Sequence, residues 1–241
     1  DRVIAGSLYL DNSEIDNIDL RLEYYFGFNQ FFTAGIFSKE ILNPIEETVN
    51  ESGDLIITSY QNVPLAEING FEIEYEQVFE AIMDSPNDLL VKFNYTETES
   101  EVIVNPGDTY INSIGTVVDA QNLLANGRDT RLQGQSDTIA NFQIGLDNLQ
   151  NQTQATLIVN YVSDRVRARG IDVLPDIIEE PPLLVDFAFS KIYSYPEFEL
   201  KLSLELRNLL DEEYYASMRN IAIYDQYDLG TSASLGFKIS F

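Results

Sequence analysis

The sequence of 241 residues contains no cysteine and no histidine. Without cysteine it has neither a disulfide nor a thiolate nucleophile, and without histidine it lacks the usual general base and most zinc ligands. Glycine-rich phosphate loops are also missing. A hydrolase that uses carboxylates alone needs a distinguishable pair, and nothing singles out one pair among the 40 acidic residues. We therefore expect neither an enzyme nor a bound cofactor.

Positive charge is scarce as well, because 14 Lys and Arg stand against 40 Asp and Glu and the net charge is -26. Such a chain repels phosphate backbones, so nucleic acid is not an expected partner. No apolar run approaches the ~18 residues that a membrane helix needs. Tryptophan is absent, but 14 Tyr and 14 Phe favour strands. Half of each strand in a transmembrane β-barrel is polar, so a barrel needs no long apolar run.

Apolar and polar residues alternate along about ten segments, and the clearest alternation lies near the C-terminus. There the two faces of one strand separate completely, with Phe198, Leu200, Leu202, Leu204 and Leu206 on one side and Glu199, Lys201, Ser203, Glu205 and Arg207 on the other. Similar alternation is found in segments 20–26, 71–75, 89–95, 140–146 and 155–161. A polar inner face of this kind fits a wet or plugged lumen. The alternative is a soluble carbohydrate-binding β-sandwich, in which protein would bury the leucine face.

The connections between these segments alternate in length. Counted back from the last residue, they are 211–228, 193–196, 165–179, 148–151, 100–127, 83–87, 42–53 and 27–30, alternately long and short. Outer-membrane barrels have short periplasmic turns and longer outer loops, whereas an immunoglobulin-like sandwich or a jelly roll gives no such alternation. The sequence therefore predicts an all-β fold, a partial transmembrane antiparallel β-barrel with about ten strands in an up-and-down meander.

The last strand ends on an aromatic residue, with apolar side chains at Leu235, Phe237, Ile239 and Phe241. Outer-membrane barrels present their final strand to the barrel assembly machinery with this pattern. We expect Gly236, Ile239 and Phe241 to form such an assembly signal. The alternative is an ordinary amphipathic last strand of a soluble sheet.

Two groups in the predicted outer loops are candidate ligand-binding residues. The first group is Tyr214, Tyr215, Arg219, Tyr224 and Tyr227, which can stack on and hydrogen-bond to a small ligand, or else form the aromatic girdle of the membrane interface. The second is Arg165, Arg167 and Arg169, which can attract an anionic ligand or contact lipopolysaccharide phosphates. The acidic pairs Glu46-Glu47, Glu179-Glu180 and Glu212-Glu213 lack the spacing of calcium ligands, so no metal site is expected.

Several segments, in order along the chain, resemble the TonB-dependent outer-membrane receptors. The strongest is 206–215 (LRNLLDEEYY), which is similar to the family's Asn-Leu-hydrophobic-Asp-x-x-Tyr stretch near the end of the penultimate strand. Segment 62–74 (NVPLAEINGFEIE) resembles another strand of the family. Shorter matches are 19–26, 37–39, 43–46 and 132–136.

The resemblance implies a barrel of about 22 strands with a plugged lumen. Residues 1–241 would then be the C-terminal portion of the barrel, without plug domain or signal peptide, since the opening Asp1-Arg2-Val3 is not a signal sequence. It further implies import of a scarce nutrient, such as a ferric siderophore, at the bacterial outer membrane. The implied partners are outer-membrane lipid and lipopolysaccharide, the TonB complex through the plug, the assembly machinery and a small-molecule ligand.

Other transport functions remain open at this point. An oligosaccharide or another solute is the alternative cargo within the same family, and a porin-like passive channel is the alternative outside it.

An open arc of strands has two unpaired edges, which we expect at 2–10 and 232–241.

Overall fold

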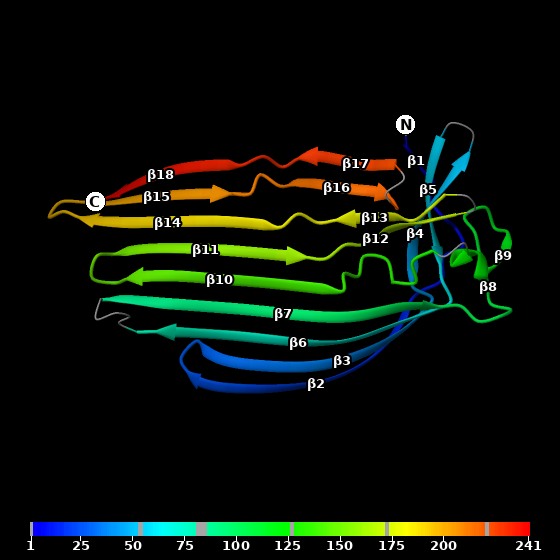
Figure 1. Cartoon of the computed structure of the whole chain (residues 1–241), viewed down its shortest axis with the longest axis horizontal. Coiled ribbons are helices and arrows are strands. Elements are labelled where there is room, and N and C mark those ends of the chain that lie inside the picture. Colours follow the sequence, from blue (N-terminus) through cyan, green and yellow to red (C-terminus); the bar gives the residue numbers. More distant parts are fainter. Residues whose placement is uncertain (1, 53–54, 81–85, 126–127, 172–173, 220–221) are drawn as a thin grey trace.

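A computed structural model describes residues 2–52, 55–80, 86–125, 128–171, 174–219 and 222–241. In this part of the chain the fold is all-β, as predicted, and the helical residues form one short 3-10 turn, η2 (Ala120–Leu123). Within the same residues no helix is long and apolar enough to cross a membrane. The strands form sheets of nine, seven and two strands (Figure 1).

The nine-stranded sheet is an antiparallel meander whose strands follow chain order, as predicted. Its strands are β2 (Glu14–Gly27), β3 (Gln30–Leu42), β6 (Leu65–Phe79), β7 (Asn87–Ile103), β10 (Thr138–Asn148), β11 (Thr153–Val162), β14 (Leu184–Ser194), β15 (Glu199–Arg207) and β18 (Ser232–Ser240). Every neighbouring pair is antiparallel. The chain leaves this sheet after β3 and returns at β6, so the intervening hairpin belongs elsewhere.

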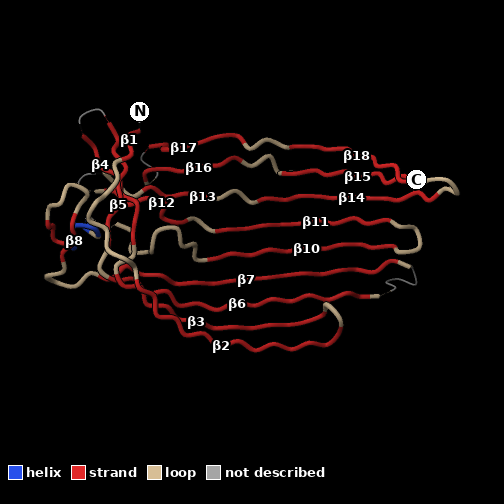
Figure 2. The backbone as a smooth tube through the Cα atoms, turned by 180° about the vertical axis from the view of Figure 1, so that it is seen from behind, coloured by secondary structure: helices blue, strands red, loops and turns tan. Residues whose placement is uncertain are grey.

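The short connections gather at one end of this sheet, together with the C-terminus (Figures 1 and 2). They join β2 to β3, β10 to β11 and β14 to β15. Part of the predicted turn 83–87 lies outside the described residues. The long connections lie at the opposite end, called here the loop end, so the described connections confirm the predicted alternation.

The two faces of the nine-stranded sheet differ across its whole width. In the register of the strand pairs, apolar residues oppose apolar residues from one edge strand to the other, and we call this side the apolar face. It includes Leu22, Tyr24, Phe32, Ala34, Ile73, Tyr75, Phe93, Tyr95, Ala140, Phe142, Leu157, Val159, Phe187, Phe189, Leu202, Leu204, Leu235 and Phe237. Gln77 and Lys191 are polar exceptions, and the Lys191 Nζ lies 5.1 Å from the Tyr193 ring. None of the buried core residues in the described chain belongs to this face, so no protein layer covers it.

The opposite face carries polar contacts between strands. Asn141 of β10 donates to Asn94 of β7 over 2.7 Å and accepts from Asn160 of β11 over 2.6 Å. Arg21 of β2 reaches across β3 to Glu72 and Glu74 of β6, at 3.3 and 3.5 Å. This face is the polar face predicted for a lumen.

The seven-stranded sheet occupies the loop end, and five of its strands lie in segments predicted as loops, 42–53, 165–179 and 211–228. Its strands, in sheet order, are β1 (Arg2–Ile4), β5 (Leu55–Asn62), β4 (Ile45–Ser52), β12 (Arg165–Gly170), β13 (Ile177–Glu180), β16 (Glu213–Met218) and β17 (Ala222–Asp228). The pairs β1–β5 and β12–β4 are parallel, so the prediction that every strand pairs antiparallel with a sequence neighbour is wrong here. In Figure 1, β12, β13, β16 and β17 continue the directions of β11, β14, β15 and β18, whereas β1, β4 and β5 run across them.

A small hydrophobic core also lies at the loop end. The two-stranded sheet, β8 (Thr109–Ile111) and β9 (Val117–Asp119), and η2 pack there against β6 and β7. The buried residues of this core are Val63, Ala66, Val102, Tyr110, Ala120 and Leu123. It holds the connection between β7 and β10 against the sheet.

The nine-stranded sheet is open at both edges. Its edge strands are β2 and β18, which do not pair with one another. The expected edge at 232–241 is confirmed, but the expected edge at 2–10 is wrong, because Arg2–Ile4 pairs with β5 in the second sheet. The edge strands β2 and β18 both run from the loop end toward the short-turn end (Figure 1).

Candidate functional site

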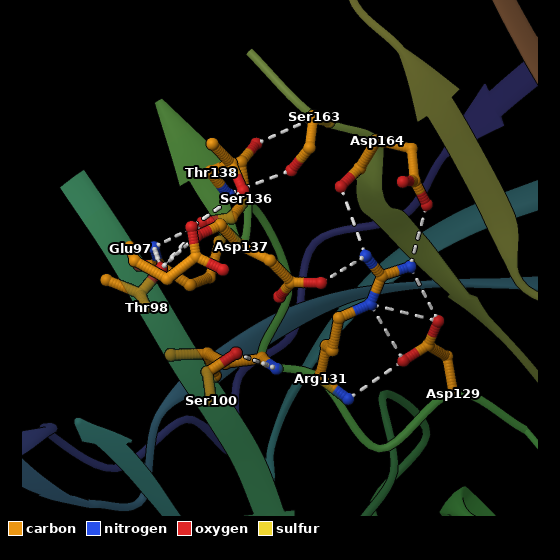
Figure 3. Close-up of polar contacts among 12 residues, drawn as sticks. Glu97, Thr98, Ser100, Asp129, Arg131, Ser136, Asp137, Thr138, Ser163 and Asp164 are labelled. Atoms are coloured by element: carbon orange, nitrogen blue, oxygen red, sulfur yellow. Dashed lines mark hydrogen bonds and ion pairs between the residues drawn. The ribbon is translucent and has the colours of Figure 1, made fainter. Parts of the chain in front are cut away.

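A cluster around Arg131 joins two segments of the loop end, 129–137 and the stretch after β11 that contains Asp164 (Figure 3). The Arg131 Nε donates to both carboxylate oxygens of Asp129, each at 3.1 Å. Its Nη1 donates to the Asp137 carboxylate at 3.3 Å and to the Asp164 carbonyl at 3.1 Å. Its Nη2 donates to Asp129 at 2.8 Å and to the Asp164 carboxylate at 2.9 Å. A guanidinium has five N–H donors, and all five are used here. We call these four residues the Arg131 cluster.

The backbone around the cluster fills the space between β7 and β12. The Val102 amide donates to the Thr130 carbonyl over 2.6 Å, and the Gly134 amide donates to the Val166 carbonyl over 2.8 Å. On the β7 side, the Leu132 amide also donates to the Ser100 hydroxyl over 3.2 Å. The segment 128–137 is thereby bonded on both sides, which fixes the position of Arg131 in the wall of the sheet.

The charges of the cluster stabilise one another. Burial by itself raises the pKa of Asp129, but the hydrogen bonds that it accepts from Arg131 outweigh that effect and the pKa is lowered. The hydrogen bonds with Asp129 in turn raise the pKa of Arg131. Asp129 is therefore ionised at neutral pH, and the cluster presents oriented carboxylates.

A cavity of about 670 Å³ opens beside the Arg131 cluster. We call it the wall cavity; it is lined by Asp129, Arg131, Tyr161, Val162, Ser163, Asp164, Ile178, Glu180, Pro181, Ser217 and Arg219. Tyr161 belongs to the apolar face, opposite Ala140, so the cavity adjoins the border of that face. A volume of this size holds a small organic ligand.

The three predicted arginines of β12 are all engaged by acidic or aromatic partners. Arg169 is fully buried and forms a two-pronged ion pair with Glu46 of β4, with distances of 2.5 and 2.9 Å. Arg165 pairs with Glu179 at 2.8 Å. Burial opposes the charge of Arg169, but Glu46 outweighs it and raises the pKa of the guanidinium. Two of the acidic pairs noted in the sequence thus supply partners for arginines.

The third arginine joins the predicted tyrosines. Arg167 donates to the Tyr214 hydroxyl at 2.8 Å and to Asp225 at 3.4 Å, and its guanidinium lies 5.5 Å from the Tyr224 ring. Tyr214 stacks on Tyr227 with the ring centroids 4.6 Å apart. Burial, together with the nearby Glu179 charge, raises the pKa of Tyr214 to about 12. The structure therefore brings Arg167, Tyr214, Tyr224 and Tyr227 together.

The remaining two predicted ligand residues lie apart from this group. Tyr215 follows Tyr214 on β16 and opposes Glu180 of β13, so its side chain points to the other side of the sheet. Arg219 is exposed at the end of β16, where its φ of 43° is left-handed, and it lines the wall cavity. Of the predicted ligand residues, Arg219 is thus the one found at the cavity.

The predicted assembly residues lie on and beyond β18. Gly236 opposes Ser203 of β15, and a Cβ atom at position 236 would approach the Ser203 Oγ to 2.6 Å. Ile239 is exposed on the apolar face, and Phe241 is fully exposed beyond the strand. Their proposed role in assembly stays a prediction.

Sequence reasoning did not find Arg131 or its partners. Asp129 is two positions from Arg131, but Asp164 lies 33 positions away and approaches only through the pairing of strands. The two-residue spacing of Asp129 and Arg131 is the feature of the sequence that indicates this cluster, because it places opposite charges close together. Across the described residues, no group of three or more Asp and Glu is placed to hold a metal ion.

Comparison with known proteins gives a structural likeness. No family model matches the sequence, and no curated protein sequence matches it. Among solved structures, the outer membrane transporter YddB from Escherichia coli is similar, with a TM-score of 0.60 and 12% sequence identity. The match covers 95% of this chain and 32% of that chain, so the chain spans about a third of the length of that structure. This likeness shows the fold, that of an outer-membrane barrel.

Proposed function

We propose that this chain is the C-terminal part of the barrel of an outer-membrane transporter. The observation that carries the proposal is the apolar face, which spans nine strands in register with a polar face behind it. Lipid is the surrounding that stabilises such a surface, because no protein layer covers it in the described chain.

The position of the apolar band along each strand supports this reading quantitatively. On β18 the band centres on Phe237, and on β7 it centres on Lys92, between Val91 and Phe93. The register connects Phe237 with Asn87 through Leu202, Lys191, Thr153 and Asn148. A band that followed the register would be centred on Asn87 of β7, but the observed band is centred on Lys92. The centre of the band is therefore displaced by five residues over the five steps from β18 to β7.

A shift of one residue per strand corresponds to a definite strand tilt. With ~3.3 Å per residue along a strand and ~4.8 Å between strands, a band held level in a membrane requires strands tilted by about 35°. Transmembrane β-barrels have tilts of about 35–45°. A soluble sheet has no reason to displace its apolar band by this amount in one direction.

The finer proposal is a TonB-dependent receptor that imports a scarce nutrient such as a ferric siderophore. The polar face suits contact with a plug domain, and the loop end carries the strands and cavity with which an outer ligand would be captured. In this proposal the protein lies in the bacterial outer membrane, with its short turns on the periplasmic side. Lipopolysaccharide, the assembly machinery and TonB would be its partners.

A transport assay on the complete polypeptide tests this proposal. We would express it in a Gram-negative host that lacks its own siderophore receptors, with TonB present or deleted, and measure uptake of radioactive iron from a panel of ferric siderophores. Uptake that requires both the polypeptide and TonB is the expected result.

Two other outcomes separate the alternatives. Uptake of small solutes that persists without TonB would indicate a porin-like channel. TonB-dependent growth on an oligosaccharide, without iron uptake, would indicate the same machinery with another cargo. A polypeptide recovered from the periplasm in soluble form would refute the membrane assignment itself.

A further inference from the structure

We infer that the wall cavity binds a saccharide unit, that is, a ligand rich in hydroxyl groups. The inference concerns a site in the wall of the sheet and holds whichever solute the protein transports. It rests on three features of the cavity: its hydrogen-bond acceptors, its aromatic side and its place at the border of the apolar face.

The part of the cavity beside Arg131 offers acceptors rather than donors. All five N–H groups of the Arg131 guanidinium donate to Asp129, Asp137 and Asp164, so none is left to donate to a ligand. In the described chain, Glu180 makes no side-chain hydrogen bond or ion pair, and this residue lines the same cavity. Asp129 already accepts four hydrogen bonds from Arg131, which fill its acceptor sites. Two carboxylates, those of Asp164 and Glu180, can therefore accept hydrogen bonds from hydroxyl groups.

These acceptors suit a ligand with several hydrogen-bond donors rather than a cation. Among the described residues, no three acidic side chains are placed to hold a metal ion. A cavity of about 670 Å³ accommodates a ring of sugar size with room for a second. A saccharide ring carries several hydroxyl donors, and the Asp164 carboxylate, which Arg131 holds in place, costs little ordering when the ring binds.

An aromatic ring completes the site. Tyr161 belongs to the apolar face and lines the cavity. Its side chain is 43% exposed, so its ring is accessible to a ligand. The C–H groups on one side of a saccharide ring pack on an aromatic ring, while the hydroxyl groups at its edge meet the carboxylates. Arg219, which is exposed and also lines the cavity, supplies donors for the ring oxygens.

The place of the cavity allows two sources of the saccharide. Because Tyr161 lies at the border of the apolar face on the loop side, the saccharide headgroup of an outer-leaflet glycolipid would be within reach. A free oligosaccharide from outside would have the same chemistry. Both sources are tested below.

The test is binding to an array of immobilised glycans by the complete polypeptide, purified in detergent. One arm of the array holds neutral oligosaccharides, and the other holds delipidated core oligosaccharides of lipopolysaccharide. The variants are Glu180→Gln, which keeps the shape but removes the charge, and Tyr161→Ala. Their matched controls are Glu101→Gln on β7 and Tyr193→Ala on β14, both outside the cavity. Electrophoretic mobility before and after heating shows that each variant is folded.

We expect retention on at least one arm, with apparent affinity reduced about tenfold by Glu180→Gln and about threefold to tenfold by Tyr161→Ala. The controls should bind like the parent protein. Retention on the neutral arm identifies a free saccharide, and retention on the core arm identifies a glycolipid headgroup. No retention on either arm, or retention that both cavity variants leave unchanged, overturns the inference. A failure of iron transport has no bearing on this result.

Discussion

Two neighbouring residues of β15 allow a direct test of the lipid-facing side. Leu204 lies on the apolar face between Phe189 of β14 and Leu235 of β18. Ser203 lies on the polar face between Ser190 and Gly236. Because they are adjacent on one strand, substitutions at the two positions sit at nearly the same membrane depth but on opposite faces.

We expect Leu204→Arg to destabilise the barrel by about 2–4 kcal/mol, because it moves a guanidinium into lipid near the middle of the band. This penalty lowers the folding equilibrium constant by about 30-fold to about 900-fold. Ser203→Arg should cost less than about 1 kcal/mol. Its guanidinium enters the polar lumen, and Gly236 opposite leaves room beside the strand.

The measurement is a urea titration of the complete polypeptide in lipid vesicles, with folding followed by the electrophoretic shift between unheated and heated samples. The difference between the two variants is the decisive quantity, since both add the same charge and volume. Equal penalties at the two positions, or a larger one for Ser203→Arg, would refute the assignment of the faces.

Four further predictions concern the loop end and the sheet edges. Arg169→Met should destabilise the loop end by about 3–5 kcal/mol, because it leaves the buried Glu46 charge uncompensated, and hydrogen exchange of β4 and β5 should rise. The lowered pKa of Asp129 adds stability that is complete above its ordinary value of 3.8 and is lost as pH falls through the lowered pKa; Arg131→Gln should remove this acid dependence in hydrogen exchange of segment 128–137. The raised pKa of Tyr214 should appear as a tyrosine ionisation at about 12 in an ultraviolet titration and disappear in Tyr214→Phe, and because the unfolded tyrosine ionises near 10.0, stability should fall as pH rises between these values. Residues 1–241 produced alone should aggregate or stay unfolded in detergent, since β2 and β18 expose unpaired backbone groups, and a heat-modifiable monomer on a gel would contradict this.

Sequence alternation was enough to predict the strands of the long sheet. The apolar residues of β15 and β18 recur at every second position, and a period of two places them on one face whatever the partners are. The lengths of the connections then predicted that the short turns lie at the same end of the sheet as the C-terminus. The alternation and the connection lengths are both local properties of the sequence, so they can be read without knowledge of tertiary contacts.

The loop end could not be predicted in the same way. The segments that form β4, β12 and β16 are short, and part of their pairing is with strands that are distant in sequence, β12 with β4 and β16 with β13. Arg169 looked like part of an exposed basic patch, yet it is buried, because Glu46 neutralises it from 123 positions away. The Arg131 cluster depends on the same kind of long-range pairing. Sequence reasoning named the arginines of β12 as candidate ligand-binding residues but could not supply the partners that they have within the chain.

The direction of the two edge strands has a consequence for how a barrel can close. Because β2 and β18 both run toward the short-turn end, joining them directly would make a parallel pair. Placing two such arcs side by side in the same orientation would also create parallel seams. An all-antiparallel closure needs an odd number of additional strands between the edges. Nine plus an odd number is even, which agrees with the even strand counts of single-chain bacterial outer-membrane barrels.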